Sequence, residues 1–129
     1  SDLPLLHTDR LRLRMVLKNL LGNAVKFTDA GTIELGVSER NNGVEFAVVD
    51  TGIGIGATDR ERIFEPFFQV DGSSRGRGGA GLGLYIVRRM VELLRGEVKL
   101  ESDPGRGTTV RVWIPCEPVP LKSPPAPVV

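Results

Sequence analysis

Two pairs of strand-like segments, each joined by a tight turn, constrain the fold of this chain more than any other feature. Apolar and polar residues alternate over 32–39 and 44–50, and the Asn-Asn-Gly sequence at 41–43 between them is a strong hairpin signal. A second pair of strands, 97–102 and 108–114, is separated by a short segment that holds two glycines and a proline. Because hairpin-connected strands are antiparallel neighbours, the pattern predicts a mostly antiparallel sheet.

Helical periodicity precedes and separates these hairpins. Asp9 is a good N-cap for a helix that runs to about Phe27, and a second long helix is expected over 82–95, where Gly96 ends it. The predicted buried stripe of the first helix is Leu13, Leu17, Leu20 and Ala24, and that of the second is Ile86, Val87, Met90, Val91 and Leu94. With a short helix over 59–64 and a possible entering strand at 3–8, we expect an α/β fold. Its architecture would be a two-layer sandwich, a mixed, mostly antiparallel sheet under three helices.

Composition limits the classes of function. The 129 residues are 40% hydrophobic and 26% charged, which is typical of one soluble globular domain. The net charge of +1 disfavours a nucleic-acid-binding protein. A single cysteine, Cys116, excludes an internal disulfide, and a single histidine, His7, excludes a histidine-cluster metal site. Since no apolar run approaches the roughly 18–20 residues of a membrane span, we expect no direct membrane contact.

The first predicted helix carries a polar face. Asn19, Asn23 and Lys26 follow one another at intervals of four and three residues, so they project from one side of the helix. A carboxamide oxygen suits Mg²⁺, and a nearby lysine suits phosphate. Taken alone, a solvated helix surface is the simpler interpretation of this face.

Two glycine-rich segments could approach a ligand. Residues 50–56 place Asp50 at the end of an apolar strand, where its carboxylate could accept a hydrogen bond from an exocyclic amine, although a strand-end turn explains the segment equally well. Residues 65–79 lack periodicity and are expected to form a long loop, which leads into the helix at 82. A literal G-x-G-x-x-G over 76–81 follows no strand, so it is not a dinucleotide motif. Either an anion site at the helix N-terminus or a flexible solvent loop fits the segment.

These segments occur in the order that characterises one family. The match runs NLLGNAVKFT (19–28) for the N box of sensor histidine kinases, DTGIGI (50–55) for the G1 box, IFEPFFQVD (63–71) for the F box, GGAGLGL (78–84) for the G2 box and GRGTT (105–109) for the G3 element. Over residues 8–115 the chain therefore resembles the catalytic, ATP-binding domain of a bacterial histidine kinase, in the superfamily of gyrase, heat-shock chaperone and mismatch-repair ATPases. The resemblance implies a domain over 1–115 and a Pro-rich linker or tail over 116–129.

The same resemblance implies an Mg-ATP site. Asn23 would ligate Mg²⁺, and Asn19 and Lys26 would hold phosphates or metal-bound water, which makes these three the expected catalytic residues. Asp50 would bind the adenine amino group, with Thr108 supporting it through water. The other expected nucleotide contacts are Phe27, Gly52, Ile53, Gly54, Ile55, Phe68, Gly79, Gly81, Leu82 and Gly83. A lid over 69–80 would close on the triphosphate, anchored by Phe64, Phe67 and Phe68.

Position 19 separates two functions within the superfamily. The hydrolysing members carry glutamate there as a general base, whereas Asn19 cannot accept a proton. This favours transfer of the γ-phosphoryl group to a histidine over the rival function, an ATP-hydrolysing conformational machine. The context of His7 is not that of a phosphoacceptor, so the acceptor would lie on an upstream dimerisation domain. The resemblance further implies a cytoplasmic domain, monomeric as this fragment and homodimeric in the full-length protein, that works with a response regulator.

Overall fold

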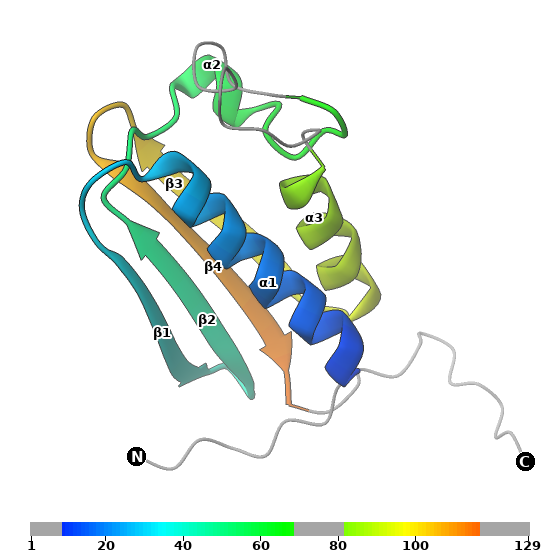
Figure 1. Ribbon diagram of the computed structural model, residues 1–129. Helices are drawn as coiled ribbons and strands as arrows, with labels where there is room; N and C mark the ends of the chain where they lie inside the picture. The colour runs from blue at the N-terminus through cyan, green and yellow to red at the C-terminus, as the bar shows by residue number, and fades with distance from the viewer. Residues whose placement is uncertain (1–8, 69–81, 117–129) are drawn as a thin grey trace, which may run out of the picture.

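The computed structural model of the protein describes residues 9–68 and 82–116, and its elements form two layers (Figure 1). Four strands make one sheet, and the two longer helices lie across one of its faces. In chain order the elements are α1 (Arg10–Phe27), β1 (Ile33–Arg40), β2 (Gly43–Asp50), α2 (Ala57–Arg60), α3 (Gly83–Leu93), β3 (Glu97–Asp103) and β4 (Gly107–Pro115).

The sheet has the order β1-β2-β4-β3 and confirms both predicted hairpins and the two-layer α/β sandwich. In the turn between β1 and β2, Asn41 and Asn42 have φ angles of 47° and 60°, a left-handed conformation that asparagine tolerates. All three strand pairs are antiparallel, so the predicted mixed character is not present among these four strands. The strand predicted over 3–8 lies outside the described residues.

Helix α1 begins where the sequence predicts. The Asp9 side chain accepts a hydrogen bond from the Arg12 N–H at 3.1 Å and so caps the first turn. The residues that α1 buries are Val16, Leu20 and Ala24. Leu13 and Leu17 were predicted to be buried with Leu20 and Ala24, but they are only half-buried. The residues that face the sheet are Val16 and those four and eight positions after it.

The second predicted helix is confirmed and the short one is corrected. In α3 the buried residues are Leu84, Val87 and Val91. The predicted apolar face is thus confirmed at Val87, Val91 and the following Leu94, whereas Ile86 and Met90 are only half-buried. The helix predicted over 59–64 instead begins at Ala57 and ends at Arg60. Beyond it the chain makes turns closed by i to i−3 hydrogen bonds, such as Glu65 N–H to Arg62 O at 2.9 Å. Pro66 disfavours helical backbone at Glu65, so these turns do not continue as a helix past that residue.

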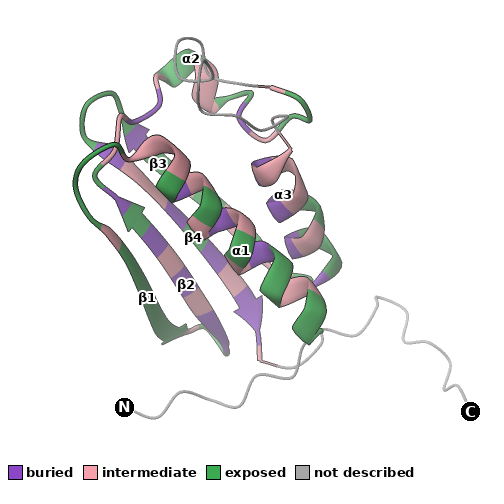
Figure 2. Ribbon diagram, viewed as in Figure 1, coloured by how far each residue is buried: buried purple, intermediate pink, exposed green. Residues whose placement is uncertain are grey.

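The hydrophobic core lies between the helices and the inner faces of β2 and β4. Its strand residues are Val44, Phe46, Val48, Val110, Val112 and Ile114. Figure 2 shows the same alternation as buried bands along the two central strands, whereas β1 at the sheet edge is almost wholly exposed. The register places Asp50, the last residue of β2, opposite Thr108 near the start of β4. Two sequence motifs that are 58 residues apart therefore meet at one end of the core.

Candidate functional site

The predicted ligand residues meet at the end of the sheet where β2 stops and β4 starts, under the C-terminal half of α1. A small cavity of about 10 Å³ lies there, with room for roughly one water molecule. The residues that line it are Leu20, Asn23, Ala24, Phe27, Val48, Asp50, Ile55, Thr108 and Val110. Five of these nine were predicted as nucleotide contacts from the sequence, and the other four supply apolar walls.

Asp50 is the charged residue of this cavity, and it is only 7% exposed. Its Oδ1 accepts hydrogen bonds from the backbone N–H of Gly52 at 2.9 Å and of Thr108 at 3.2 Å. Its Oδ2 accepts none from any residue in the described part of the chain. Oδ2 is not fully buried, and a carboxylate oxygen that keeps some exposure at a cavity is well suited to accept an N–H from a ligand.

A buried hydroxyl that the sequence analysis missed supports this arrangement. Ser102, 6% exposed, accepts a hydrogen bond from the Ile55 N–H at 2.7 Å and donates to Gly107 O at 2.9 Å. Its Oγ also lies 2.7 Å from the Thr108 hydroxyl oxygen. Ser102 thus ties the loop after β2 to the β3–β4 turn. The sequence held a signal for it, since Ser102 continues the inward-facing series of Val98 and Leu100 in β3, where an apolar residue is expected.

The glycines of the loop after β2 are explained by backbone packing. A Cβ on Gly52 would lie 2.1 Å from Phe27 O, and one on Gly54, whose φ is +76°, would lie 1.9 Å from Asp103 O. Between these two glycines, the backbone of Ile53 lies against both neighbouring segments. Its N–H donates to Phe27 O at 3.1 Å, and its carbonyl accepts from the Gly105 N–H at 2.7 Å. The predicted contacts of Gly52, Ile53 and Gly54 with a base remain predictions, because none of the three lines the cavity.

The polar face of α1 points toward the start of α3. A Cβ placed on Gly83 would lie 3.6 Å from Asn19 Oδ1 and 3.8 Å from Asn23 Oδ1, so both carboxamides adjoin the first residue of α3. Asn19 Nδ2 donates to Met15 O at 2.7 Å. Leu82, at the N-cap of α3, makes no side-chain capping bond, and the helix is 11 residues long. The positive dipole end of α3, with its first N–H groups, therefore lies beside two amide oxygens.

The remaining predicted site residues lie near the Asp50 cavity, farther from it, or outside the described residues. Lys26 lies beside the Phe27 ring, with Nζ 5.4 Å from the ring centroid. Phe68 is half-buried against the core, and the Arg62 guanidinium lies 4.7 Å from its ring centroid. Of the expected lid anchors, Phe64 also packs on the core, whereas Phe67 is 71% exposed. Gly79, Gly81 and the lid expected over 69–80 lie outside the described residues.

The donor set fits a magnesium ion carried with phosphates. Within residues 9–68 and 82–116, no three His, Cys, Asp or Glu side chains cluster closely enough to hold a metal ion by themselves. Mg²⁺ that binds with a nucleotide needs few protein ligands, because phosphate oxygens and water complete its octahedron. The Oδ1 atom of Asn23, beside the α3 N-terminus, is an oxygen of the type that Mg²⁺ binds, and the neutral carboxamides of Asn19 and Asn23 add no negative charge that would repel phosphate.

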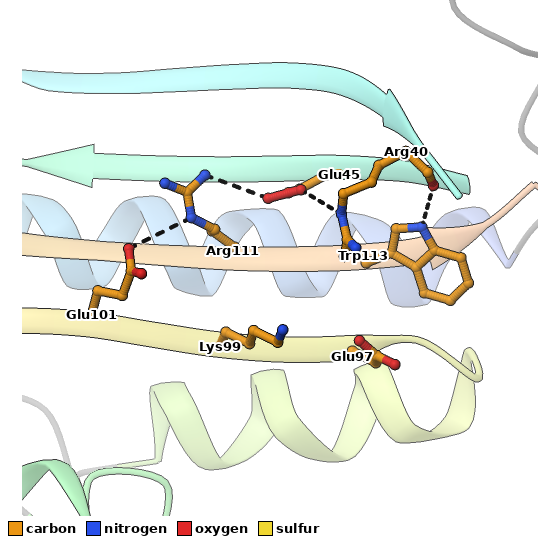
Figure 3. A pocket seen from close by; sticks show the side chains of 7 residues that line it. All are labelled: Arg40, Glu45, Glu97, Lys99, Glu101, Arg111 and Trp113. Carbon is orange, nitrogen blue, oxygen red and sulfur yellow. Dashed lines mark hydrogen bonds and ion pairs between the residues drawn. The ribbon is translucent and has the colours of Figure 1, made fainter. Parts of the chain in front are cut away.

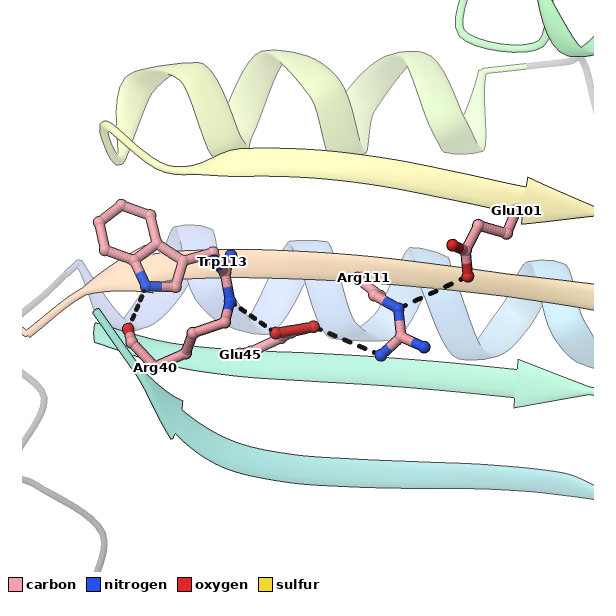
Figure 4. Close-up of polar contacts among 5 residues, drawn as sticks. All are labelled: Arg40, Glu45, Glu101, Arg111 and Trp113. Carbon is pink, nitrogen blue, oxygen red and sulfur yellow. Dashed lines mark hydrogen bonds and ion pairs between the residues drawn. The ribbon is translucent and has the colours of Figure 1, made fainter. Parts of the chain in front are cut away.

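A larger hollow, about 310 Å³, lies on the opposite, outer face of the sheet (Figure 3). We call the ion-paired residues there the outer-face cluster, which consists of Arg40, Glu45, Glu101 and Arg111 (Figure 4). Glu45 Oε1 lies 2.8 Å from Arg40 Nε, and Glu45 Oε2 lies 3.4 Å from an Arg111 nitrogen. Trp113 Nε1 donates to Arg40 O at 2.6 Å. Because these charges neutralise one another, we assign the hollow to the surface of the sheet rather than to the ligand site.

None of the helices in the described segments has the length and apolar character that crossing a membrane requires.

Comparisons with known proteins agree with the geometry. Residues 8–118 match the family described as Histidine kinase-, DNA gyrase B-, and HSP90-like ATPase. Among curated relatives, the chain is 45% identical over 119 residues to Autoinducer 2 sensor kinase/phosphatase LuxQ of Vibrio vulnificus, covering 87% of this chain and 14% of that protein. It is 49% identical over 110 residues to Virulence sensor protein BvgS of Bordetella bronchiseptica, covering 81% and 9%. The chain thus spans only a small part of the length of these relatives.

Solved structures give the same result. Full-length ShkA in complex with AMPPNP superposes with a TM-score of 0.80 and 40% identity, over 92% of this chain and 24% of that one. The mycobacterial sensor histidine kinase MprB gives a TM-score of 0.78 and 30% identity, over 88% of this chain and 78% of the other. A nucleotide-free catalytic domain of the histidine kinase ThkA gives 0.73 and 29%, over 88% and 73%.

Proposed function

This chain belongs to the histidine kinase-, DNA gyrase B- and HSP90-like ATPase family, and from that premise we propose that it binds Mg-ATP and donates the γ-phosphoryl group to a histidine on another domain. The observation that carries the proposal is the buried Asp50, whose free Oδ2 lines a cavity beside the amide oxygens of α1. The relatives that the chain resembles are sensor kinases, and one structural neighbour was solved with an ATP analogue.

Adenine recognition would depend on Asp50. Two backbone N–H groups hold Oδ1, so the carboxylate cannot turn away, and Oδ2 is left to accept the exocyclic amino group. Apolar walls from Val48, Ile55 and Val110 would contact the flat base. A water molecule in the cavity could connect Thr108 to the base, which is the water-mediated role expected from the sequence.

The triphosphate would lie between α1 and the N-terminus of α3. The first N–H groups of α3, which the Leu82 side chain does not cap, would donate to phosphate oxygens, and Lys26 adds a positive charge at the end of α1. Asn23 would ligate Mg²⁺ and Asn19 would hold a phosphate or a metal-bound water. When bound, Mg²⁺ neutralises charge on the β- and γ-phosphates. The residues of the chain then position the γ-phosphoryl group for in-line attack.

Transfer is favoured over hydrolysis by the side chain at position 19. Activation of water needs a base, and the carboxamide of Asn19 takes no proton. An imidazole needs no such activation, since its neutral nitrogen is already a nucleophile. The histidine would belong to an upstream dimerisation domain of a homodimeric, full-length sensor kinase, and a response regulator would receive the phosphoryl group. We place the reaction in the cytoplasm, and assign residues 1–115 to the catalytic domain and 116–129 to a linker.

The test is a radiolabelled ATP assay on this chain, with and without the acceptor domain of its own full-length protein. We expect ATP hydrolysis close to background for the chain alone. With the acceptor present, we expect a labelled product that is labile in acid and stable in base, as phosphohistidine is. Fast phosphate release by the chain alone, with no labelled acceptor, would instead establish the ATP-hydrolysing alternative.

A further inference from the structure

The first half of α1 carries a surface that the nucleotide site does not use. Arg10, Arg14 and Lys18 form one row at i, i+4 and i+8, and Leu13 and Leu17 lie in the neighbouring row. Together these five residues line a hollow of about 410 Å³. We call this surface the α1 flank. It faces away from α3, because the opposite side of α1 presents Asn19 and Asn23 to Gly83.

The charge of the α1 flank works against the stability of the helix. The first turn of α1 contains no acidic residue, so Arg10 lies at the positive end of the helix dipole. Like charges spaced four residues apart also repel one another. Within the described segments, none of Arg10, Arg14 and Lys18 forms an ion pair, whereas Arg12 on another side of the helix lies 3.7 Å from the Asp9 carboxylate. Within the described segments, three cations without ion-pair partners thus lie next to two leucines. The binding of a partner explains this arrangement better than a contribution to folding does.

The edge of the sheet carries further exposed apolar side chains. Leu35 and Val37 of β1 lie opposite the buried Val48 and Phe46 in the register, so they share the helix-covered face of the sheet. They are nevertheless 45% and 40% exposed, since no helix lies over β1 (Figures 1 and 2). Exposed apolar side chains on β1 thus add to the cations and leucines of the α1 flank, and exposed apolar residues can mark interaction sites.

We propose that the α1 flank binds an acidic amphipathic helix of a partner protein, whose carboxylates pair with Arg10, Arg14 and Lys18 while its apolar residues pack on Leu13 and Leu17. A helix suits the surface because its side chains also repeat at i and i+4, in step with both rows. The chain itself does not offer such a ligand. Residues 1–8 and 117–129 contain one acidic residue each, and α2 and α3 contain one each.

The half-buried state of its leucines distinguishes this surface from one that lies on lipid. A membrane-binding helix inserts its apolar side chains about 5–10 Å into the boundary between headgroups and acyl chains. Leu13 and Leu17 are instead half-buried against the core of the domain, so a partner can contact them but they cannot be inserted into a bilayer. The side chains of a protein helix can pack on such a surface, so we favour a protein partner over an anionic bilayer.

The experiment uses this chain and a fluorescent synthetic peptide of about 18 residues, with leucines at i, i+3, i+4 and i+7 and glutamates beside them. We expect binding that weakens with salt and falls at least about tenfold when Arg10, Arg14 and Lys18 are all changed to Glu. Leu17→Gln should also weaken it. The matched control changes Arg88, Arg89 and Arg95 of the α3 region to Glu, with the same change in net charge and no loss of peptide binding.

Each other outcome overturns the proposal. If the α1 and α3 triple variants lost peptide binding equally, the binding would depend only on net charge. If the unchanged protein did not bind the peptide, the proposed interaction would not exist. Binding to phosphatidylserine vesicles but not to the peptide would assign the surface to lipid. Dimerisation in analytical ultracentrifugation that the α1 variant abolishes, without peptide binding, would assign it to a second copy. Circular dichroism and binding of an ATP analogue verify that each variant is folded.

Discussion

Two carboxylates on β2, Glu45 and Asp50, show how differently the two faces of one strand can use an acidic residue. Both are shielded from solvent, with 11% of the Glu45 side chain and 7% of Asp50 exposed. Glu45, on the outer face, has an arginine at each carboxylate oxygen. Asp50, on the inner face, has two neutral N–H donors on one oxygen and, within the described part of the chain, none on the other.

The difference favours the cavity at Asp50 as the ligand site. The hollow above the outer-face cluster is about 310 Å³ and the cavity at Asp50 only about 10 Å³, so size alone would not point to Asp50. In the outer-face cluster, the carboxylates are paired with arginines of the same sheet, so these side chains do not need a ligand to neutralise them. At Asp50, one carboxylate oxygen accepts no hydrogen bond from the described part of the chain, and the same cavity is lined by Asn23. The proposed nucleotide site therefore rests on unused polar capacity rather than on volume.

The largest effect is expected from a test of whether phosphoryl transfer depends on the helix-covered side of the sheet, where Asn23 lies. Asn23→Ala in the full-length protein should lower phosphorylation of the acceptor histidine by more than about 100-fold, because charge stabilisation by a metal ion is worth several kcal/mol. Radiolabel transfer from ATP measures it. As a control, Asn42→Gly suits the φ of 60° in the β1–β2 turn and should leave transfer unchanged. Equal rates for Asn23→Ala and the unchanged protein would remove Asn23 from the site.

The second test sets the two carboxylates directly against each other. Asp50→Asn keeps the shape of the side chain but replaces an acceptor-only group with one that also donates. Losing a charged hydrogen bond costs ~1.5–3 kcal/mol, so affinity for ATP or ADP should fall roughly tenfold to a hundredfold. Glu45→Gln should leave the affinity unchanged. Calorimetric titration decides, and the comparison fails if both variants lose affinity equally.

A third test asks whether the buried hydroxyl holds the inner side together. Ser102→Ala leaves the Ile55 N–H and Gly107 O without their partner, which should lower the free energy of unfolding by about 1–3 kcal/mol. Urea denaturation measures the loss. Ser38→Ala, on the exposed surface of β1, is the control and should change stability by less than about 0.5 kcal/mol. Matching midpoints for the two variants would show that Ser102 is not required.

The smallest effect is expected on the outer face. Glu45→Gln should cost about 1 kcal/mol or less, since both arginine partners remain partly exposed and can be solvated. The cost should shrink in roughly 1 M salt, where the Debye length is only about 3 Å. Urea denaturation at low and high salt checks this. A large cost that salt does not change would mean that the outer-face cluster stabilises the fold as strongly as the inner network does.

Local signals in the sequence predicted the individual elements well. The Asp9 cap and the Asn-Asn-Gly turn act over a few residues, and both are present as predicted. The pairing of β2 with β4, which brings Thr108 to Asp50, joins two separate hairpins, and no local pattern specifies it. Ser102 was not predicted because its importance lies in hydrogen-bond partners from two other segments, the loop after β2 and the start of β4. The assignment of Asn19 and Asn23 to a metal and phosphates came from the order of the motifs, not from periodicity.

The register of β2 against β4 also has a consequence for protein synthesis. A nascent chain that has emerged only as far as β2 already contains Asn23 and Asp50, but it lacks the amide of Thr108 and the hydroxyl of Ser102. The cavity is therefore complete only after the last strand has left the ribosome and entered the centre of the sheet. Such long-range pairing forms late, because a large loop must close first. ATP binding would thus be the last property that the growing domain acquires, and a chain released before β4 should have none.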